Sequence, residues 1–114
     1  MLRSNERITY EERGEDLIVH IKGEIDHHSA VLVRTGIDEE IIIKRPKQVL
    51  LELSAVDFMD SSGLGLIMGR YMKMQAVGGV LVLREPNERI LKIFKLAGLE
   101  KIVNIERNEN KYDG

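Results

Sequence analysis

Two hydroxyls and two carboxylates stand close together near the middle of the chain. Residues 56–65 read Val-Asp-Phe-Met-Asp-Ser-Ser-Gly-Leu-Gly, after an apolar run at 49–53 and before a helical pattern at 64–74. At a helix start, a Ser or Asp oxygen accepts a backbone hydrogen bond, and the partial positive charge there favours an anion. The stretch therefore predicts a helix start at which Ser61 or Ser62 either caps the helix or carries a phosphate.

A second polar group lies at residues 23–30, which read Gly-Glu-Ile-Asp-His-His-Ser-Ala. Asp26 predicts the N-cap of a helix that runs to about Lys44. The adjacent His27 and His28 are the obvious metal candidates, but neighbours on a helix point about 100° apart. Helical two-ligand sites use i, i+3 or i, i+4 spacing. With three His and no Cys in the chain, the sequence predicts no metal site.

The same residues offer little for catalysis. Ser61 and Ser62 are not in a Gly-x-Ser-x-Gly elbow, because Met59 and Asp60 occupy the positions two before them. The chain has no Walker-type phosphate loop, and Gly63-Leu64-Gly65 alone is weak evidence for nucleotide binding. A pair between Ser61 and His27 or His28 stays open at this point. We predict no enzyme activity, no catalytic residue and no cofactor.

Bulk composition narrows the class of protein further. One hundred and fourteen residues suffice for one small domain, and 43% hydrophobic with 32% charged residues is typical of a soluble chain. A net charge of −2 gives no basic field for nucleic acid. The polar start of the chain is no signal peptide, and no apolar run is long enough to span a membrane. We therefore expect a cytoplasmic protein that binds neither nucleic acid nor membrane.

Hydrophobic periodicity and turn residues predict an α/β fold with a mixed sheet. Strands are expected at 8–12 and 17–21, forming an N-terminal hairpin, and then at 48–53, 80–83 and within 101–106. Strand–helix–strand units supply helices at 26–44 and 64–74 and a third that starts near Asn87 and ends before Gly98. A single domain spans 1–114, with its core at about 8–106 and a polar tail at 107–114.

The helical patterns also predict which side chains are buried. The first helix is expected to bury Ala30, Val33, Ile37 and Ile41. The second is expected to bury Leu64, Ile67, Met68, Tyr71 and Met72, with Arg70, Lys73 and Gln75 in solvent.

Residues 60–65, Asp-Ser-Ser-Gly-Leu-Gly, resemble the signature of the STAS domain, the family of bacterial anti-sigma factor antagonists. In that family the first serine after the aspartate is phosphorylated, which implies Ser61 as the acceptor and leaves Ser62 to cap the helix. Residues 23–30 are similar to the sporulation branch, although Ile25 stands where Leu is usual. General-stress relatives typically lack the paired histidines. The family fold implies one partner-binding surface formed by Glu24, Asp26, His27, Asp60, Ser61, Ser62, Gly63 and Gly65.

The resemblance also implies partners. An unphosphorylated antagonist of this branch binds an anti-sigma factor and makes it release sigma-F. That anti-sigma factor is a GHKL-type serine kinase, which holds the ATP itself and phosphorylates the antagonist; a PP2C-type phosphatase reverses the step. Three alternatives stay open: an antagonist in the general stress response, a STAS scaffold or nucleotide-sensing module, and a small hydrolase that uses Ser61 with a histidine.

Overall fold

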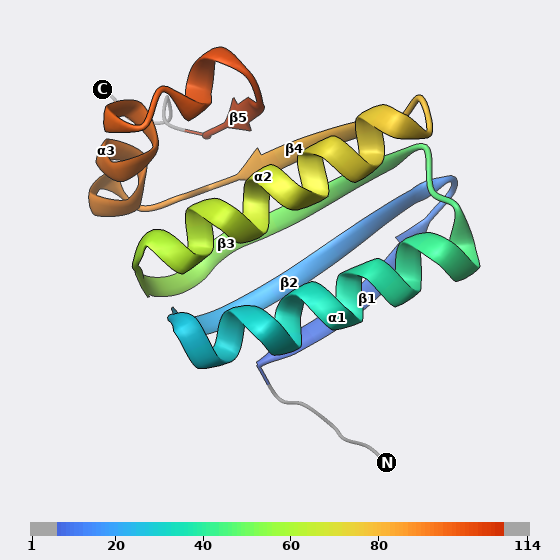
Figure 1. Cartoon of the computed structure of the whole chain (residues 1–114), viewed down its shortest axis with the longest axis horizontal. Helices are drawn as coiled ribbons and strands as arrows, with labels where there is room; N and C mark the ends of the chain where they lie inside the picture. Colours follow the sequence, from blue (N-terminus) through green and yellow to red (C-terminus); the bar gives the residue numbers. More distant parts are fainter. Residues whose placement is uncertain (1–6, 109–114) are drawn as a thin grey trace.

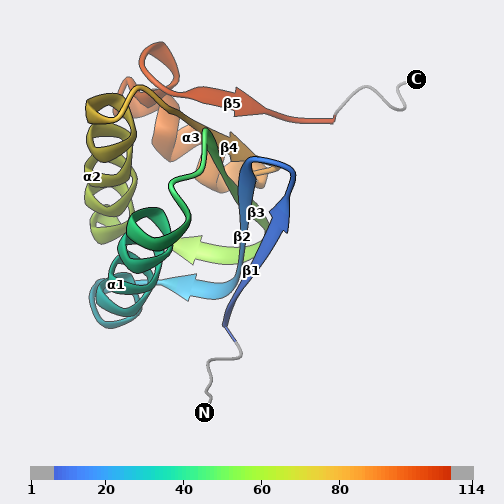
Figure 2. The ribbon, with the colours of Figure 1, turned by 90° about the vertical axis from the view of Figure 1, so that its right-hand side faces the viewer.

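The computed structural model describes residues 7–108 and shows a sheet with helices α1 and α2 side by side on one face (Figures 1 and 2). The strands lie in the order β1-β2-β3-β4-β5. The elements in chain order are β1 (Ile8–Arg13), β2 (Asp16–Ile25), α1 (His27–Lys44), β3 (Gln48–Met59), α2 (Ser61–Ala76), β4 (Val80–Arg84), α3 (Glu88–Leu96), the 3-10 helix η1 (Leu99–Lys101) and β5 (Asn104–Glu106).

Sheet topology confirms the predicted class. β1 and β2 form an antiparallel hairpin, and β2, β3, β4 and β5 pair in parallel through strand–helix–strand connections. Because β2 and β3 are parallel neighbours, their carboxyl ends meet at one edge, where Ile25 pairs with Met59. The same edge carries the starts of α1 and α2.

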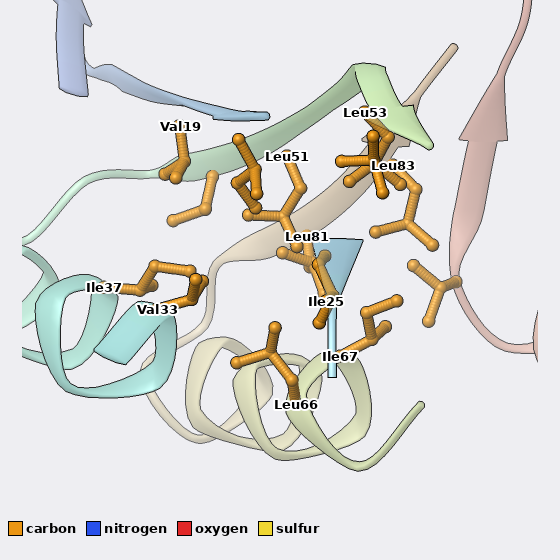
Figure 3. Packing of buried hydrophobic residues seen from close by; sticks show 14 of the residues in the cluster. Val19, Ile25, Val33, Ile37, Leu51, Leu53, Leu66, Ile67, Leu81 and Leu83 are labelled. Atoms are coloured by element: carbon orange, nitrogen blue, oxygen red, sulfur yellow. The ribbon is translucent and has the colours of Figure 1, made fainter. Parts of the chain in front are cut away.

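The larger of two buried apolar clusters lies between the sheet and the two long helices (Figure 3), and the smaller one consists of Ile18, Leu50 and Val82. Side chains of β2, β3 and β4, such as Val19, Leu51 and Leu83, are fully buried in the larger cluster. α1 contributes the four residues expected from its pattern, Ala30, Val33, Ile37 and Ile41. Burying each large aliphatic side chain stabilises the fold by roughly 1.5–3 kcal/mol, so this layer fixes where the helices start.

Two strands are longer than the sequence pattern indicates. β2 continues past the predicted end at 21 to Ile25, and β3 continues past 53 to Met59. Their extensions pair with each other, with register shifts after His20 and after Gly23, where the backbone takes φ +92°. These irregularities break the alternation of apolar residues, which is why the sequence suggested a turn there.

The buried face of α2 differs from the prediction. Arg70, expected in solvent, is 5% exposed, and its Nε lies 2.9 Å from Asp38 Oδ1 on α1. Met72, expected in the core, is 64% exposed, whereas Leu66 and Met74 are buried. The reason is that α2 packs against α1 as well as against the sheet, so the side facing its neighbour is also covered.

The C-terminal region departs in detail from the expected pattern. β5, with three residues, lies within the predicted range 101–106, and the 3-10 helix η1 at Leu99–Lys101 is an element that the sequence pattern did not predict. The first residues of the predicted tail make contacts: Arg107 lies 3.6 Å from Glu88, and the Asn108 N–H donates to Glu85 at 3.0 Å. The rest of that tail and the polar start at 1–6 lie outside the described residues. Within 7–108, no helix has the length and apolar character to cross a bilayer.

Candidate functional site

The two polar stretches of the sequence meet at the carboxyl edge of β2 and β3. The Asp60 N–H donates to the Ile25 carbonyl at 3.2 Å, one residue beyond the last strand pair. Asp26 and Asp60 are therefore neighbouring residues, each the N-cap of the helix that follows it. The starts of α1 and α2 form one continuous surface.

The start of α1 is a closed capping box. The Asp26 carboxylate accepts the backbone N–H groups of His28 and Ser29, both at 3.0 Å. The Ser29 hydroxyl accepts the Asp26 N–H at 2.9 Å and donates to the Glu24 carbonyl at 2.8 Å. The backbone hydrogen bond from Ser29 is the main cause that holds the pKa of Asp26 below its ordinary value. Ser29 is buried, so its hydroxyl is structural.

The start of α2 is arranged differently from the prediction. Asp60 is the N-cap and accepts the Ser62 N–H at 2.8 Å, so neither serine caps the helix. Ser61 and Ser62 are its first two residues. The third residue, Gly63, is buried, and a Cβ there would lie 2.2 Å from Met59 Cγ. The predicted cap role of Ser62 fails because the preceding carboxylate already occupies that position.

This arrangement leaves the Ser61 side chain exposed and Ser62 partly buried. Among residues 7–108, the structure gives the Ser61 hydroxyl no hydrogen-bond partner. A hydroxyl at the first residue of a capped helix has no structural task and lies in the partial positive charge of the helix start. Chemically, such a hydroxyl is accessible to modification, and the helix start around it favours an anion.

The other predicted contact residues divide into exposed and buried ones. Glu24 and His27 are exposed, and Asp26 and Asp60 are partly so. Gly65 is exposed, with nothing within 4 Å of the place a Cβ would take. Gly63 is the exception: it is buried against Met59, so its position does not support a direct contact with a partner.

The described part of the chain shows no geometry for a Ser–His catalytic pair or for a metal site. The rings of His27 and His28 pack edge to face with centroids 5.9 Å apart, and neither is hydrogen-bonded to Ser61 there. Residues 7–108 hold no group of three or more His, Cys, Asp or Glu placed to bind a metal.

Phe58 is a surface residue that sequence reasoning passed over. It pairs with Glu24 across β2 and β3, two residues before Asp60, and is 44% exposed. Asp57 beside it is also exposed, so the strand loses its alternation here. This break in the alternation of buried and exposed residues is the signal by which the sequence could have revealed Phe58. An exposed aromatic side chain next to a polar site is typical of a contact surface.

Comparisons with known proteins agree on one family. A family model described as the STAS domain matches residues 7–112. An anti-sigma F factor antagonist of Paenibacillus polymyxa is 38% identical over 105 residues, covering 92% of this chain and 90% of that protein. An anti-sigma-B factor antagonist of Bacillus subtilis is 31% identical over 101 residues, covering 89% and 91%.

Solved structures give the same result. The anti-sigma factor antagonist SpoIIAA in its unphosphorylated form superposes with a TM-score of 0.70 at 27% identity, covering 87% of this chain and 86% of that one. The Bacillus cell fate determinant SpoIIAA in the phosphorylated form gives 0.70 at 29% identity, covering 90% and 93%. The family match over residues 7–112 spans both helix starts and the whole sheet. This chain therefore belongs to the STAS-domain family.

Proposed function

We propose that this protein is an anti-sigma factor antagonist that phosphorylation of Ser61 switches off. The observation that carries the proposal is the exposed Ser61 hydroxyl, which stands at the first residue of α2 while Asp60 already caps that helix. The names of the similar proteins support the first half of the proposal. The existence of SpoIIAA in two phosphorylation forms supports the second half.

Electrostatics explains why a phosphate there blocks binding without unfolding the domain. Phosphorylation adds about −1.5 to −2 charges at neutral pH. At a helix N-terminus that charge is locally favourable by about 0.3–2 kcal/mol, so the fold persists. In a docked interface beside Asp60, the same charge is desolvated and repelled, at a cost of several kcal/mol. Because each 1.4 kcal/mol is tenfold in affinity, the partner dissociates first.

The partner we propose is an anti-sigma factor of the GHKL serine-kinase type, released from sigma-F when this protein binds it. ATP belongs to that kinase, and a PP2C-type phosphatase restores the hydroxyl, so this chain itself needs no cofactor and is not an enzyme. Its place is the cytoplasm, with sporulation as the process. We treat residues 1–114 as one domain with its core at about 8–106.

The contact surface we propose follows the shared edge of the two helix starts. Its polar members are Glu24, Asp26 and His27 near the start of α1, and Asp60, Ser61 and Ser62 at the start of α2. Phe58, on β3 opposite Glu24, is its apolar member. Gly65 leaves room for the partner's backbone, and Gly63 acts indirectly by letting α2 settle on Met59.

Site-mapping mass spectrometry after incubation with the cognate anti-sigma kinase and ATP tests the switch. We expect one phosphate on Ser61, its loss in Ser61→Ala, and its retention in the matched control Ser62→Ala. Ser61→Asp is expected to weaken partner binding at least about tenfold with the melting temperature unchanged. An unmodified chain, with the kinase active on another substrate, would sink the proposal.

The open space at Gly65 gives a second test. Gly65→Ala should stabilise α2 by about 0.5–1 kcal/mol, because Gly is a poor helix former, and yet weaken binding of the partner. Gly69→Ala is the matched control, one turn further along and equally open, and should stabilise without affecting binding. Urea unfolding and calorimetric titration measure the two effects. Equal affinities for both variants would remove Gly65 from the contact surface.

The second candidate is an antagonist of a general-stress anti-sigma factor, favoured by the similarity to the sigma-B antagonist of Bacillus subtilis. His27 and His28, both exposed at the start of α1, support the sporulation assignment. Titrating the chain against an anti-sigma-F and an anti-sigma-B factor distinguishes the two, since only the true partner should bind tightly and lose affinity when Ser61 is phosphorylated.

A further inference from the structure

A groove is lined by residues at the C-terminal ends of α1 and α2. Both helix ends lie at the far end of the helices from their starts, where Ser61 stands (Figure 1). The volume of the groove is about 720 Å³, and its apolar lining includes Ile41, Ile42, Pro46 and Val77. This is within the range of about 300–1,000 Å³ typical of binding sites. α2 runs for 16 residues at about 1.5 Å each, so the groove lies about 24 Å from Ser61 and is separate from that site.

The walls of the groove keep large apolar side chains in water. Ile42 from α1 is 69% exposed, and Val77 at the end of α2 is 67% exposed. Both are β-branched residues, which are poorer helix formers than the polar residues usual on a solvated helix end. Neither local helix stability nor the core therefore accounts for them, and together they form an apolar surface with no partner in the described chain.

Charge in the groove has one sign. Among the described residues that line it, the charged ones are Arg45 and Lys47, both cations. Lys47 reaches Glu15 at 3.3 Å with both side chains largely in solvent, whereas no carboxylate within 7–108 is in ion-pair distance of Arg45. The dipole at the end of α1 favours a cation, but Lys44, paired with Glu40 at 3.1 Å, already supplies one.

Backbone conformation adds to the case for Arg45. It is the C-cap of α1 with φ 48° and ψ 56°, a left-handed conformation that Gly adopts without strain and that other residues adopt at a cost. A guanidinium without a described ion-pair partner thus stands at a position where Gly would be easier, at the mouth of an apolar groove.

We propose that this groove docks an acidic amphipathic helix of another protein. Its apolar side chains would lie between Ile42 and Val77, and its carboxylates would meet Arg45 and Lys47. The groove is partly open to solvent, which suits a helix that keeps a polar face in water, whereas a small ligand is normally buried over most of its surface. Since Ser61 is at the opposite end, the docked helix and the anti-sigma factor bind independently.

Nitrogen-15 NMR of the full chain tests the proposal with two synthetic helical peptides of equal length. One pairs a leucine stripe with glutamates, and the other carries lysines in place of the glutamates. We expect the acidic peptide to shift the amide signals of residues 41–45, 47 and 77–79, with an affinity that falls as salt is added, and the basic peptide to leave them unchanged.

Two groove variants separate binding from stability. Ile42→Gln and Arg45→Gly should each weaken the acidic peptide about threefold to tenfold while the melting temperature stays at or above that of the wild type. Leu96→Gln, at a site 85% exposed on α3 and outside the groove, is the matched control and should leave peptide binding unchanged.

Several results would overturn the proposal. These are the absence of shifts at 41–45, 47 and 77–79, equal binding of the basic peptide, or a loss of affinity in Leu96→Gln as large as in Ile42→Gln. Concentration-dependent shifts of the same signals without peptide would show that a second copy of this chain occupies the groove instead. Each experiment leaves Ser61 intact, so failure here does not bear on the phosphorylation switch.

Discussion

The starts of α1 and α2 lie side by side and are each capped by an aspartate, yet they differ at the third helical position. In α1 that position is Ser29, which closes the capping box and is buried. In α2 it is Gly63, over a space that Met59 fills, and the hydroxyls stand instead at the first two positions. One start uses its hydroxyl for structure, and the other keeps Ser61 in solvent with Ser62 partly buried beside it.

This difference shows how a fold separates a structural serine from one free to react. Both segments satisfy their first backbone N–H groups through an aspartate. What differs is whether a side chain at the third position can turn back to the cap, and Met59 prevents this in α2. The availability of Ser61 thus depends on packing beneath the helix as much as on Ser61 itself.

The most disruptive way to break the comparison is to copy the α1 arrangement into α2. Gly63→Ser would place a Cβ 2.2 Å from Met59 Cγ, in a site where Met59 is only 1% exposed. We expect the free energy of unfolding to fall by about 2–3 kcal/mol, the usual cost of overpacking a core. Urea denaturation measures it. A variant as stable as the wild type would show that Gly63 is not there for space.

Removing each hydroxyl in turn sharpens the comparison with a smaller effect. Ser29→Ala leaves the Asp26 N–H and the Glu24 carbonyl without their serine partner and should cost about 1–2 kcal/mol. Ser61→Ala removes a hydroxyl with no described partner and should change stability by less than about 0.5 kcal/mol. Similar losses in the two variants would erase the distinction between the helix starts.

The smallest expected effect is a change in acid sensitivity. The folded-state pKa of Asp26 is lowered by the Ser29 N–H above all, so its carboxylate stabilises the fold above the ordinary pKa of 3.8. That contribution is lost as pH falls from the ordinary pKa through the lowered one. Asp26→Asn should therefore show a shallower loss of unfolding free energy on acidification, measured by urea titrations at several pH values. If the unfolding free energies of the variant and the wild type fell equally with pH in the acid range, the capping role of Asp26 would be contradicted.

Local signals in the sequence were sufficient for the class of fold, the cap at Asp26 and the buried stripe of α1. They failed where tertiary packing decides. Arg70 is predicted in solvent because its partner Asp38 is 32 positions away on another helix. Ser62 is expected as the cap because the family resemblance assigns Ser61 to the phosphate, whereas Asp60 holds the cap position. The candidate site was found through the polar residues of two short stretches, whereas Phe58 and the contact under Gly63 depend on the register of β2 against β3.

The ion pair between Arg70 and Asp38 has a mechanical consequence for any switch at Ser61. It joins α1 to α2, and sliding either helix by one turn, about 5.4 Å, would leave the buried Arg70 guanidinium without its carboxylate partner. The ion pair therefore opposes any shift of α2 along its axis relative to α1. If Ser61 is phosphorylated as proposed, the added charge would therefore change the surface at the start of α2 without moving the helix.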